Sequence, residues 1–564
     1  MEALDWLVIG VFFLALIGII VWVVRQKQND SADYFLGGRD ATWLAIGASI
    51  FASNIGSEHL IGLAGAGASS GMAMAHWEIQ GWMILILGWV FVPFYSRSMV
   101  YTMPEFLERR YNPQSRTILS VISLVSYVLT KVAVTVYAGG LVFQQVFGIK
   151  ELWGIDFFWI AAIGLVVLTA LYTIFGGMKS VLYTSVLQTP ILLLGSLIIL
   201  VLGFKELGGW DEMMRVCGAV TVNDYGDTMT NLIRSNDDAN FPWLGALIGS
   251  AIIGFWYWCT DQFIVQRVLS GKNEKEARRG TIFGAYLKLL PVFLFLIPGM
   301  IAFALHQKYI GAGGEGFLPM LANGTANADA AFPTLVAKLL PAGVKGLVVC
   351  GILAALMSSL ASLFNSSAML FTIDFYKRFR PETPEKKLVG IGQIATVVIV
   401  ILGILWIPIM RSVGDVLYTY LQDVQSVLAP GIAAAFLLGI CWKRTSAQGG
   451  MWGLIAGMII GLTRLGAKVY YSNAGEVADS TFKYLFYDMN WLFFCGWMFL
   501  FCLIVVIVVS LATEAPTAEK IQGLVFGTAT KEQKAATRAS WDHWDIIHTV
   551  IILAITGAFY WYFW

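Results

Sequence analysis

The chain has 564 residues, of which 58% are hydrophobic and 13% are charged, and its formal net charge at pH 7 is +1. Soluble domains have about 45–50% apolar and about 25% charged residues, so this chain has too little charge to coat the several domains that its length would form in water. The composition excludes a soluble enzyme, a disordered chain and a fibrous protein, and the near-zero net charge argues against nucleic-acid binding. It is typical of a protein that crosses the membrane many times.

Apolar stretches long enough to span a bilayer, which takes about 20 residues, recur along the whole chain. We predict about fourteen spans, at residues 4–24, 42–71, 73–96, 117–147, 153–175, 180–204, 242–266, 280–305, 346–376, 388–410, 415–441, 447–468, 488–511 and 545–563. The polar connections between them are too short to hold a separate catalytic domain. The predicted fold class is therefore an all-α polytopic membrane protein.

Most of the Lys and Arg residues fall in alternate connections, beginning with residues 25–41. Because positive residues favour the cytoplasmic side, these connections are predicted to face inward, which places the N-terminus outside. An even number of spans then places the C-terminus outside as well. We expect a multi-pass protein of the plasma (inner) membrane, with the lipid bilayer as its surroundings and both termini extracytoplasmic.

Two predicted spans are interrupted by polar residues and poor helix formers, in the segments Ala52-Ser53-Asn54-Ile55-Gly56-Ser57-Glu58-His59 and Gly254-Phe255-Trp256-Tyr257-Trp258-Cys259-Thr260-Asp261. Unwound backbone at membrane depth is tolerated only where it lines a cavity in the protein. The interruptions lie five spans apart, and because five is odd the corresponding spans run in opposite directions. Secondary transporters have this inverted-repeat arrangement, with the binding site at the paired broken helices.

Charged side chains inside spans are costly and usually functional. The candidates are Glu58, Glu78, Lys131, Asp261 and Lys288. Three acids and two bases can largely neutralise one another, so structural ion pairs between helices are the alternative to a role in transport. An intramembrane enzyme would need a nucleophile with its base, or metal ligands at fixed spacing, and the sequence shows neither pattern. We expect no catalytic residues and no organic cofactor.

Small hydroxyl residues share one face of a later span. Ala355, Ser358 and Ser359 have the spacing that brings helical residues to one partner. With carbonyls freed by a broken helix, such as those of Ala52 and Ile55, the serine hydroxyls can surround a hard monovalent cation. Close packing of helices through small residues is the more frequent alternative.

Hydrogen-bonding side chains and aromatic rings gather in the spans near the interruptions. They are Asn54, His59, Glu78, Tyr257, Trp258, Lys288 and Gln422. Such a set suits a polyhydroxylated ligand, whose hydroxyls each donate and accept while an apolar face packs on an aromatic ring. The alternative is that each side chain makes a hydrogen bond between helices.

The chain resembles the solute:sodium symporter family, and within it the sodium/glucose cotransporters. The resemblance rests on the first interrupted segment and on Ala170-Leu171-Tyr172-Thr173-Ile174-Phe175-Gly176-Gly177, Trp256-Tyr257-Trp258-Cys259-Thr260-Asp261-Gln262, Gly284-Ala285-Tyr286-Leu287-Lys288-Leu289 and Leu356-Met357-Ser358-Ser359-Leu360. It implies two five-helix inverted repeats with broken first helices and flanking helices. We accordingly divide the chain into a leading helix at 1–30, a first repeat at 31–205, an extracellular loop at 206–241, a second repeat at 242–441 and trailing helices at 442–564.

The resemblance also implies residue roles. The family's main sodium site is matched by the carbonyls of Ala52, Ile55 and Ala355 and the hydroxyls of Ser358 and Ser359. The sugar-contacting positions are matched by Asn54, His59, Glu78, Tyr257, Trp258, Lys288 and Gln422. The outer-gate positions are matched by Leu63, Trp77 and Tyr418, and the inner gate by Tyr257.

Four positions depart from the family pattern. Members that carry two sodium ions have an acid where this chain has Ser185, and some of them have a serine where it has Ala355. Both changes weaken a second sodium site, so we expect one sodium ion per sugar. Gly254 replaces a threonine that contacts sugar in some relatives, which leaves the sugar open, and Glu58 resembles bacterial members more than animal ones.

The predicted function is secondary active symport, in which inward sodium movement drives uptake of a hexose such as glucose or galactose by alternating access. One alternative is the same transporter class with another cargo, such as myo-inositol, another polyol, a monocarboxylate or an amino acid. A membrane sugar sensor that binds without transporting is a further alternative.

Overall fold

The computed structural model describes residues 1–26, 30–56, 58–321, 324–411, 417–473 and 478–564. Within these residues the only strands are the short antiparallel pair β1 (Glu151–Leu152) and β2 (Ile155–Asp156), and all other regular structure is helical. The predicted all-α class is confirmed.

The helices follow one another with short connections, and several contain a π-helical or 3-10 turn (labelled η). Up to residue 207 they are α1 (Ala3–Val24), α2 (Ser31–Leu36), η1 (Gly37–Arg39), α3 (Trp43–Asn54), η2 (Glu58–Leu63), α4 (Ala64–Ser70), η3 (Gly71–Met74), α5 (Ala75–Glu78), α6 (Gly81–Ile86), η4 (Leu87–Phe91), α7 (Val92–Ser98), α8 (Met103–Arg110), α9 (Pro113–Ser126), η5 (Tyr127–Val132), α10 (Ala133–Phe147) and α11 (Phe157–Leu207).

The second part of the chain begins with the short helix that follows α11. It comprises α12 (Trp210–Gly218), α13 (Trp243–Gly254), η6 (Phe255–Thr260), α14 (Gln262–Leu269), α15 (Glu274–Lys288), η7 (Val292–Leu296), α16 (Ile297–Gly311), η8 (Ala328–Ala330), α17 (Ala331–Leu339), α18 (Val344–Met369), η9 (Leu370–Tyr376), α19 (Lys377–Phe379), α20 (Glu385–Arg411) and α21 (Leu417–Cys441). The trailing elements are α22 (Ala447–Asn473), α23 (Thr481–Lys483), η10 (Tyr484–Asp488), α24 (Trp491–Ala512), α25 (Ala518–Ile521), α26 (Lys531–Ala539) and α27 (His543–Tyr562).

Eleven helical stretches in the described part of the chain are long and apolar enough to cross a membrane. This number is lower than the predicted fourteen because some spans are made of shorter helices and because α11 covers two predicted spans. Gly177 divides α11, with φ 51° and ψ −147°. Only glycine fits there, since a Cβ would lie 2.4 Å from the carbonyl oxygen of Tyr34.

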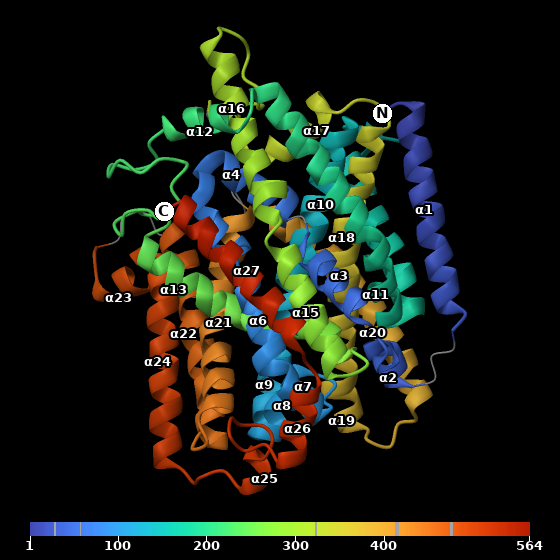
Figure 1. Cartoon of the computed structure of the whole chain (residues 1–564), viewed down its shortest axis with the longest axis vertical. Helices are drawn as coiled ribbons and strands as arrows, with labels where there is room; N and C mark the ends of the chain where they lie inside the picture. The colour runs from blue at the N-terminus through green and yellow to red at the C-terminus, as the bar shows by residue number, and fades with distance from the viewer. Residues whose placement is uncertain (27–29, 57, 322–323, 412–416, 474–477) are drawn as a thin grey trace.

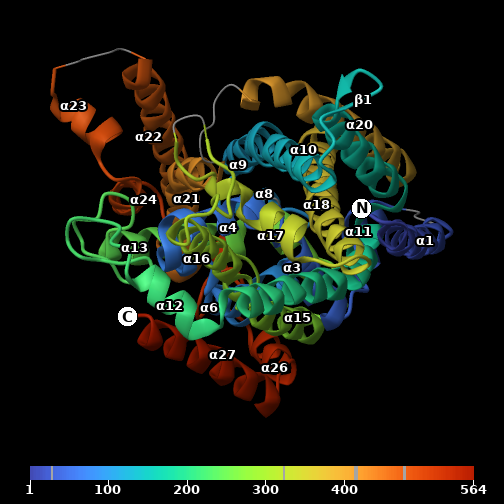
Figure 2. The same cartoon turned by 90° about the horizontal axis from the view of Figure 1, so that it is seen from above.

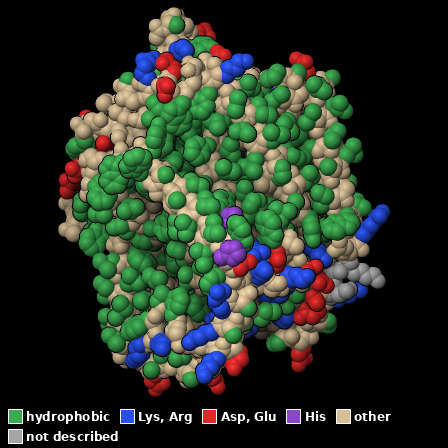
Figure 3. Space-filling view, in the orientation of Figure 1, with side chains coloured by type: hydrophobic (Ala, Val, Ile, Leu, Met, Phe, Trp, Pro, Cys, Tyr) green, Lys and Arg blue, Asp and Glu red, His purple; other side chains and the backbone are tan. Residues whose placement is uncertain are grey.

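The surface has the pattern expected of a membrane protein. Hydrophobic side chains cover the middle of the face seen in Figure 3, while charged side chains gather toward its lower and upper ends. Helix α1 is apolar apart from Asp5 in its first turn and is largely exposed, as a helix in contact with lipid would be. Both termini lie in the upper half of the molecule in Figure 1.

The interior is built around the short helix α3, which packs against α11, α15 and α18. Seen from above, α1 and α27 lie at the periphery of the bundle, and α22 and α24 flank it on another side (Figure 2). The leading and trailing helices therefore surround a central group that contains both predicted interruptions.

Helices α4 and α16 pack with their backbones in close contact. A Cβ on Gly67 would lie 2.2 Å from the carbonyl oxygen of Leu296, and one on Gly299 would lie 1.9 Å from the carbonyl oxygen of Ala64. Small residues permit this approach at membrane helix interfaces, where van der Waals contact supplies much of the stability.

We expect Gly67→Ala to destabilise the protein by about 1–3 kcal/mol, because the added methyl must push two backbones apart. The matched control is Gly18→Ala on lipid-facing α1, where nothing lies within 4 Å of the added carbon and the better helix propensity of alanine applies. The melting temperature in detergent checks both. A Gly67→Ala protein as stable as the Gly18→Ala protein would contradict the packing.

Candidate functional site

The first interruption occurs where it is predicted. Helix α3 ends at Asn54, Ile55 takes an extended conformation (φ −79°, ψ 108°), and the chain becomes helical again at Glu58. The Ser359 hydroxyl of α18 lies 3.0 Å from the carbonyl oxygen of Ser53 and 3.0 Å from that of Ile55. Because a hydroxyl has one proton, it can serve only one of these carbonyls at a time. Among the described residues, one backbone oxygen at the break is thus left for another partner.

The second interruption lies at the end of the predicted segment Gly254–Asp261. Helix α13 continues through Gly254 into the π-helical turn η6, and the backbone leaves the helix at Asp261 (φ −76°, ψ 127°). The Thr260 hydroxyl donates to the carbonyl oxygen of Trp256, 2.8 Å away, which keeps the last turn closed. The Asp261 side chain then caps the start of α14.

A cavity lies between the two interruptions and encloses about 740 Å³, including the part that is open to solvent. The part of it that a water molecule can reach measures about 70 Å³, which is smaller than the about 300–1,000 Å³ of small-molecule sites. All seven residues predicted to contact substrate line it: Asn54, His59, Glu78, Tyr257, Trp258, Lys288 and Gln422. They come from α3, η2, α5, η6, α15 and α21, so the fold brings together positions that are far apart in the sequence.

A buried ion pair forms one wall of the cavity. The Lys288 ammonium lies 2.6 Å from Glu78 Oε2, and both side chains are less than 5% exposed. His59 Nε2 lies 3.3 Å from the same carboxylate oxygen and 3.4 Å from the amide nitrogen of Asn54. The two interpretations of Glu78 and Lys288, as a structural pair and as site residues, are therefore compatible.

Several polar atoms of the cavity-lining residues are buried without a partner. These atoms are His59 Nδ1, Trp77 Nε1 and Gln422 Oε1, which make no hydrogen bond within the described part of the chain. Buried polar atoms in proteins are nearly always hydrogen-bonded, so a ligand or water is the expected partner. The rings of Tyr257 and Trp258, with centroids 5.0 Å apart, add an apolar surface beside them.

A second ion pair lies beside the ring of Tyr257. The Lys131 ammonium is 2.7 Å from Asp261 Oδ2, and the Tyr127 hydroxyl donates to the other oxygen of that carboxylate. The same ammonium lies 4.8 Å from the centroid of the Tyr257 ring and 4.9 Å from that of Phe263. This pair connects η5 to the second interruption and fixes the position of Tyr257.

The structure adds cavity residues that sequence reasoning did not assign to the site, namely Glu58, Gln80, Lys131, Thr135 and Gln425. Glu58 and Lys131 carry a recognisable signal, a charge within a span. The other three have none, because neutral polar residues in spans commonly hydrogen-bond between helices. Gln80 also explains Gly254, since a Cβ there would lie 2.4 Å from Gln80 Oε1.

The five residues predicted to bind sodium are all buried next to the first interruption: Ala52, Ile55, Ala355, Ser358 and Ser359. The Ser358 and Ser185 hydroxyls lie 3.3 Å apart, and Ser185 donates to the carbonyl oxygen of Val181, 2.6 Å away. Backbone and hydroxyl oxygens of this kind suit a hard monovalent cation. Ser185 thus places a neutral hydroxyl beside Ser358.

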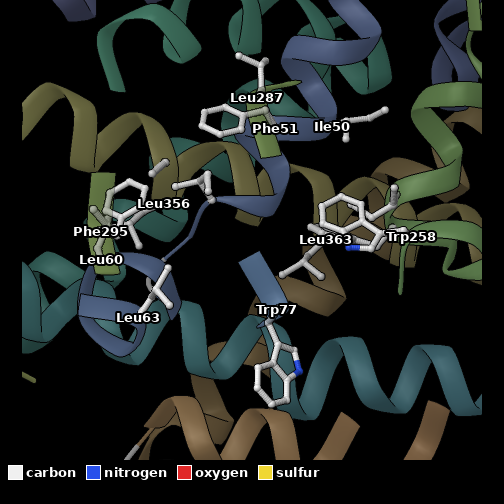
Figure 4. Close-up of a cluster of buried hydrophobic side chains, with 14 of the residues drawn as sticks. Ile50, Phe51, Leu60, Leu63, Trp77, Trp258, Leu287, Phe295, Leu356 and Leu363 are labelled. Carbon is white, nitrogen blue, oxygen red and sulfur yellow. The ribbon is translucent and has the colours of Figure 1, made fainter. Parts of the chain in front are cut away.

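The predicted gate residues occupy different surroundings. Leu63 is fully buried and lies with Leu60 and Phe295 in the hydrophobic cluster of Figure 4, outside the cavity lining. Trp77 lines the cavity and stacks on Trp491, with ring centroids 5.5 Å apart. The side chain of Tyr418 lies outside the described residues.

Comparisons with known proteins agree with one another. The family model described as Sodium:solute symporter family matches residues 34–457. Sodium/myo-inositol cotransporter 2 of Mus musculus is 37% identical over 542 residues, which are 94% of this chain and 80% of the relative. Sodium/glucose cotransporter 4 of Danio rerio is 35% identical over 560 residues, which are 96% of this chain and 84% of the relative. The chain also has the fold of a solved structure, that of a Na+-coupled sialic acid symporter in a substrate-bound outward-open state. The TM-score is 0.72 at 21% sequence identity, and the match covers 92% of this chain and 99% of the symporter chain.

The buried pair of Glu78 and Lys288 generates a stability prediction. We expect Glu78→Gln and Lys288→Met each to destabilise the protein by about 3–5 kcal/mol, because each leaves the other charge buried and unpaired. The double variant should lose less than the sum of the two. Thermal unfolding of the three proteins in detergent measures this coupling, and strictly additive losses would show that the two charges do not depend on each other.

Proposed function

The chain belongs to the sodium:solute symporter family, and we propose that it couples inward sodium movement to uptake of a hexose such as glucose or galactose by alternating access. Proteins of this family are multi-pass membrane transporters, and the chain is a sodium-coupled solute symporter and not an enzyme. The observation that carries the choice of cargo is the convergence of seven hydrogen-bonding and aromatic residues in one cavity between the two interruptions.

The charges of the cavity favour a neutral cargo. Both lysines that line it already contact a carboxylate, Lys288 with Glu78 and Lys131 with Asp261. A carboxylate cargo would need a free cation or exposed helix N-termini. Hydroxyls of a sugar can instead donate to Gln422 Oε1 and accept from Trp77 Nε1, both of which lack protein partners among the described residues.

A cyclic polyol such as myo-inositol is the second candidate cargo. Its hydroxyls present the same chemistry as those of a hexose, and sodium/myo-inositol cotransporter 2 of Mus musculus is 37% identical to this chain. Sodium/glucose cotransporter 4 of Danio rerio, at 35% identity, supports the hexose to a similar degree.

We assign the coupling sodium to the carbonyls of Ala52, Ile55 and Ala355 and the hydroxyls of Ser358 and Ser359. The assignment is supported by their burial at the first interruption and by the two carbonyl oxygens, of Ser53 and Ile55, that the Ser359 hydroxyl approaches and cannot both satisfy with its single proton. The sodium and cargo positions are then adjacent on the same segment, since Asn54 and His59 lie on either side of the break. Each ligand can thereby favour the state that binds the other.

The proposed one-ion stoichiometry sets how far the cargo can be concentrated. Moving one charge through about 100 mV supplies roughly 2.3 kcal/mol, and a tenfold sodium gradient adds about 1.4 kcal/mol. Together they support roughly a 500-fold accumulation, because each 1.4 kcal/mol is a factor of ten. The neutral Ser185 beside Ser358 supports one ion, and a second ion would square the limit.

The membrane arrangement completes the proposal. We place the protein in the plasma membrane with both termini outside, and we assign the inverted repeats to residues 31–205 and 242–441. The enrichment of the predicted inward connections in Lys and Arg supports this orientation.

Uptake into proteoliposomes tests the function directly. We expect labelled glucose or galactose to accumulate only when an inward sodium gradient is imposed, and a membrane potential that is negative inside to increase the uptake. Competition by a panel of unlabelled solutes identifies the cargo. Stronger competition by myo-inositol than by hexoses would show that the cargo is the polyol and not a hexose. Binding of sugar without sodium-dependent uptake would identify a sensor instead.

Ser359→Ala tests the sodium assignment. We expect the half-saturating sodium concentration for uptake to rise about tenfold, because the variant loses one cation ligand, while cargo affinity at saturating sodium changes little. Ser196→Ala is the matched control, since Ser196 is a buried serine on α11 whose side chain is not part of the proposed site. Equal sodium dependence in both variants would count against the assignment.

A further inference from the structure

Glu58 lines the cavity as a carboxylate without a close partner. It is half-buried, and it makes no hydrogen bond or ion pair with any residue that the structure describes. The other charged groups are already matched, since the ammonium of Lys288 lies 2.6 Å from Glu78 and that of Lys131 lies 2.7 Å from Asp261. The buried guanidinium of Arg267 is a third cation near Asp261, so the charges of this region are balanced in number, but Glu58 is the carboxylate that no cation of the described residues contacts.

The Glu58 carboxylate lies close to the broken end of α3. A Cβ on Gly56 would be 2.5 Å from Glu58 Oε2 and 3.0 Å from the Ser359 hydroxyl oxygen, so the carboxylate and the hydroxyl flank the same point. Gly56 leaves the space that the carboxylate occupies. The Ser359 hydroxyl is the group that contacts the Ser53 and Ile55 carbonyls.

This position is unfavourable for an unpaired anion. The carboxyl end of a helix carries a partial negative charge of about half a unit, which repels a carboxylate. Taking a carboxylate partly out of water without a partner adds a further penalty. A neutral sugar cannot cancel this charge, whereas a cation held by the same backbone oxygens would do so.

We propose that Glu58 is the counter-charge of the coupling cation, held beside the oxygens of the first interruption. The proposal rests on the sodium-coupled function argued above and adds to it the residue that neutralises the ion. The five assigned sodium ligands are all uncharged oxygens, so without Glu58 the ion would enter the protein with no anion beside it. Glu58 also lines the cargo cavity, as Asn54 and Tyr257 do, so the proposed ion and cargo positions share this residue.

Sodium binding without cargo tests the counter-charge separately from transport. Tracer sodium binding to the purified full chain in detergent, at one fixed pH, is compared for the wild type, Glu58→Gln and Glu58→Asp. We expect the half-saturating sodium concentration to rise about tenfold or more in Glu58→Gln, which keeps the size of the side chain and removes its charge. Glu58→Asp keeps the charge and is expected to bind sodium more tightly than Glu58→Gln.

Glu315→Gln is the control, because it removes one carboxylate from an exposed position outside the site. Melting temperatures show whether each variant is folded. If Glu58→Gln does not fold, Glu58→Asp is the variant that tests the proposal. Its shorter side chain holds the carboxylate further from the ion, so we expect its half-saturating sodium concentration to be at least about twofold that of the wild type.

Two outcomes would overturn the proposal. One is a folded Glu58→Gln protein that binds sodium as the wild type does while its sugar affinity falls, which would make Glu58 a cargo contact only. The other is an unchanged sodium affinity in both Glu58 variants. Failure of the proposed function has a different signature, because the wild type itself would then bind no sodium.

Discussion

A backbone carbonyl inside a membrane must find a hydrogen-bond donor or a cation, and the arrangement around Ile55 follows from this requirement. Helix α3 stops at Asn54 in the middle of the bundle, so its last carbonyls have no donor within the helix. The Ser359 hydroxyl reaches two of them and can satisfy one. The carbonyl oxygens at the break therefore need the Ser359 hydroxyl of α18 and one further electropositive partner. The packing of α3 against α11, α15 and α18 keeps lipid away from them.

The same low-dielectric surroundings decide how charges are placed near the break. A buried charge is tolerated when a group of opposite charge lies close to it. The Lys288 ammonium is 2.6 Å from a Glu78 carboxylate oxygen, and the Lys131 ammonium is 2.7 Å from an Asp261 carboxylate oxygen. Each pair joins segments from different parts of the chain, so the pairs hold the cavity wall in place as well as neutralising it. What remains for a ligand is a set of neutral donors, acceptors and rings, together with the single carboxylate of Glu58.

Much of this could be predicted from the sequence, for physical reasons that differ between features. Hydropathy locates the spans because the bilayer sets their length, and polar residues around Asn54 mark the first break because they are costly in a continuous apolar helix. The second break falls at Asp261, the last residue of its predicted segment, because the π-helical turn η6 continues up to Thr260 through residue types that an unwound segment would also have. The convergence of the cavity residues was inferred through family resemblance, and Gln80 was missed because a lone polar residue in a span carries no signal of where it points.

The central claim is that ion and cargo meet at the first interruption and depend on each other. Isothermal titration of the purified protein with its sugar, in sodium and in a salt of a larger cation, measures this dependence at equilibrium. The account predicts that sodium tightens sugar binding by a factor of about 5–150 and that sugar tightens sodium binding by the same factor, since coupling between two sites is reciprocal. Sugar affinities that are equal with and without sodium would contradict it.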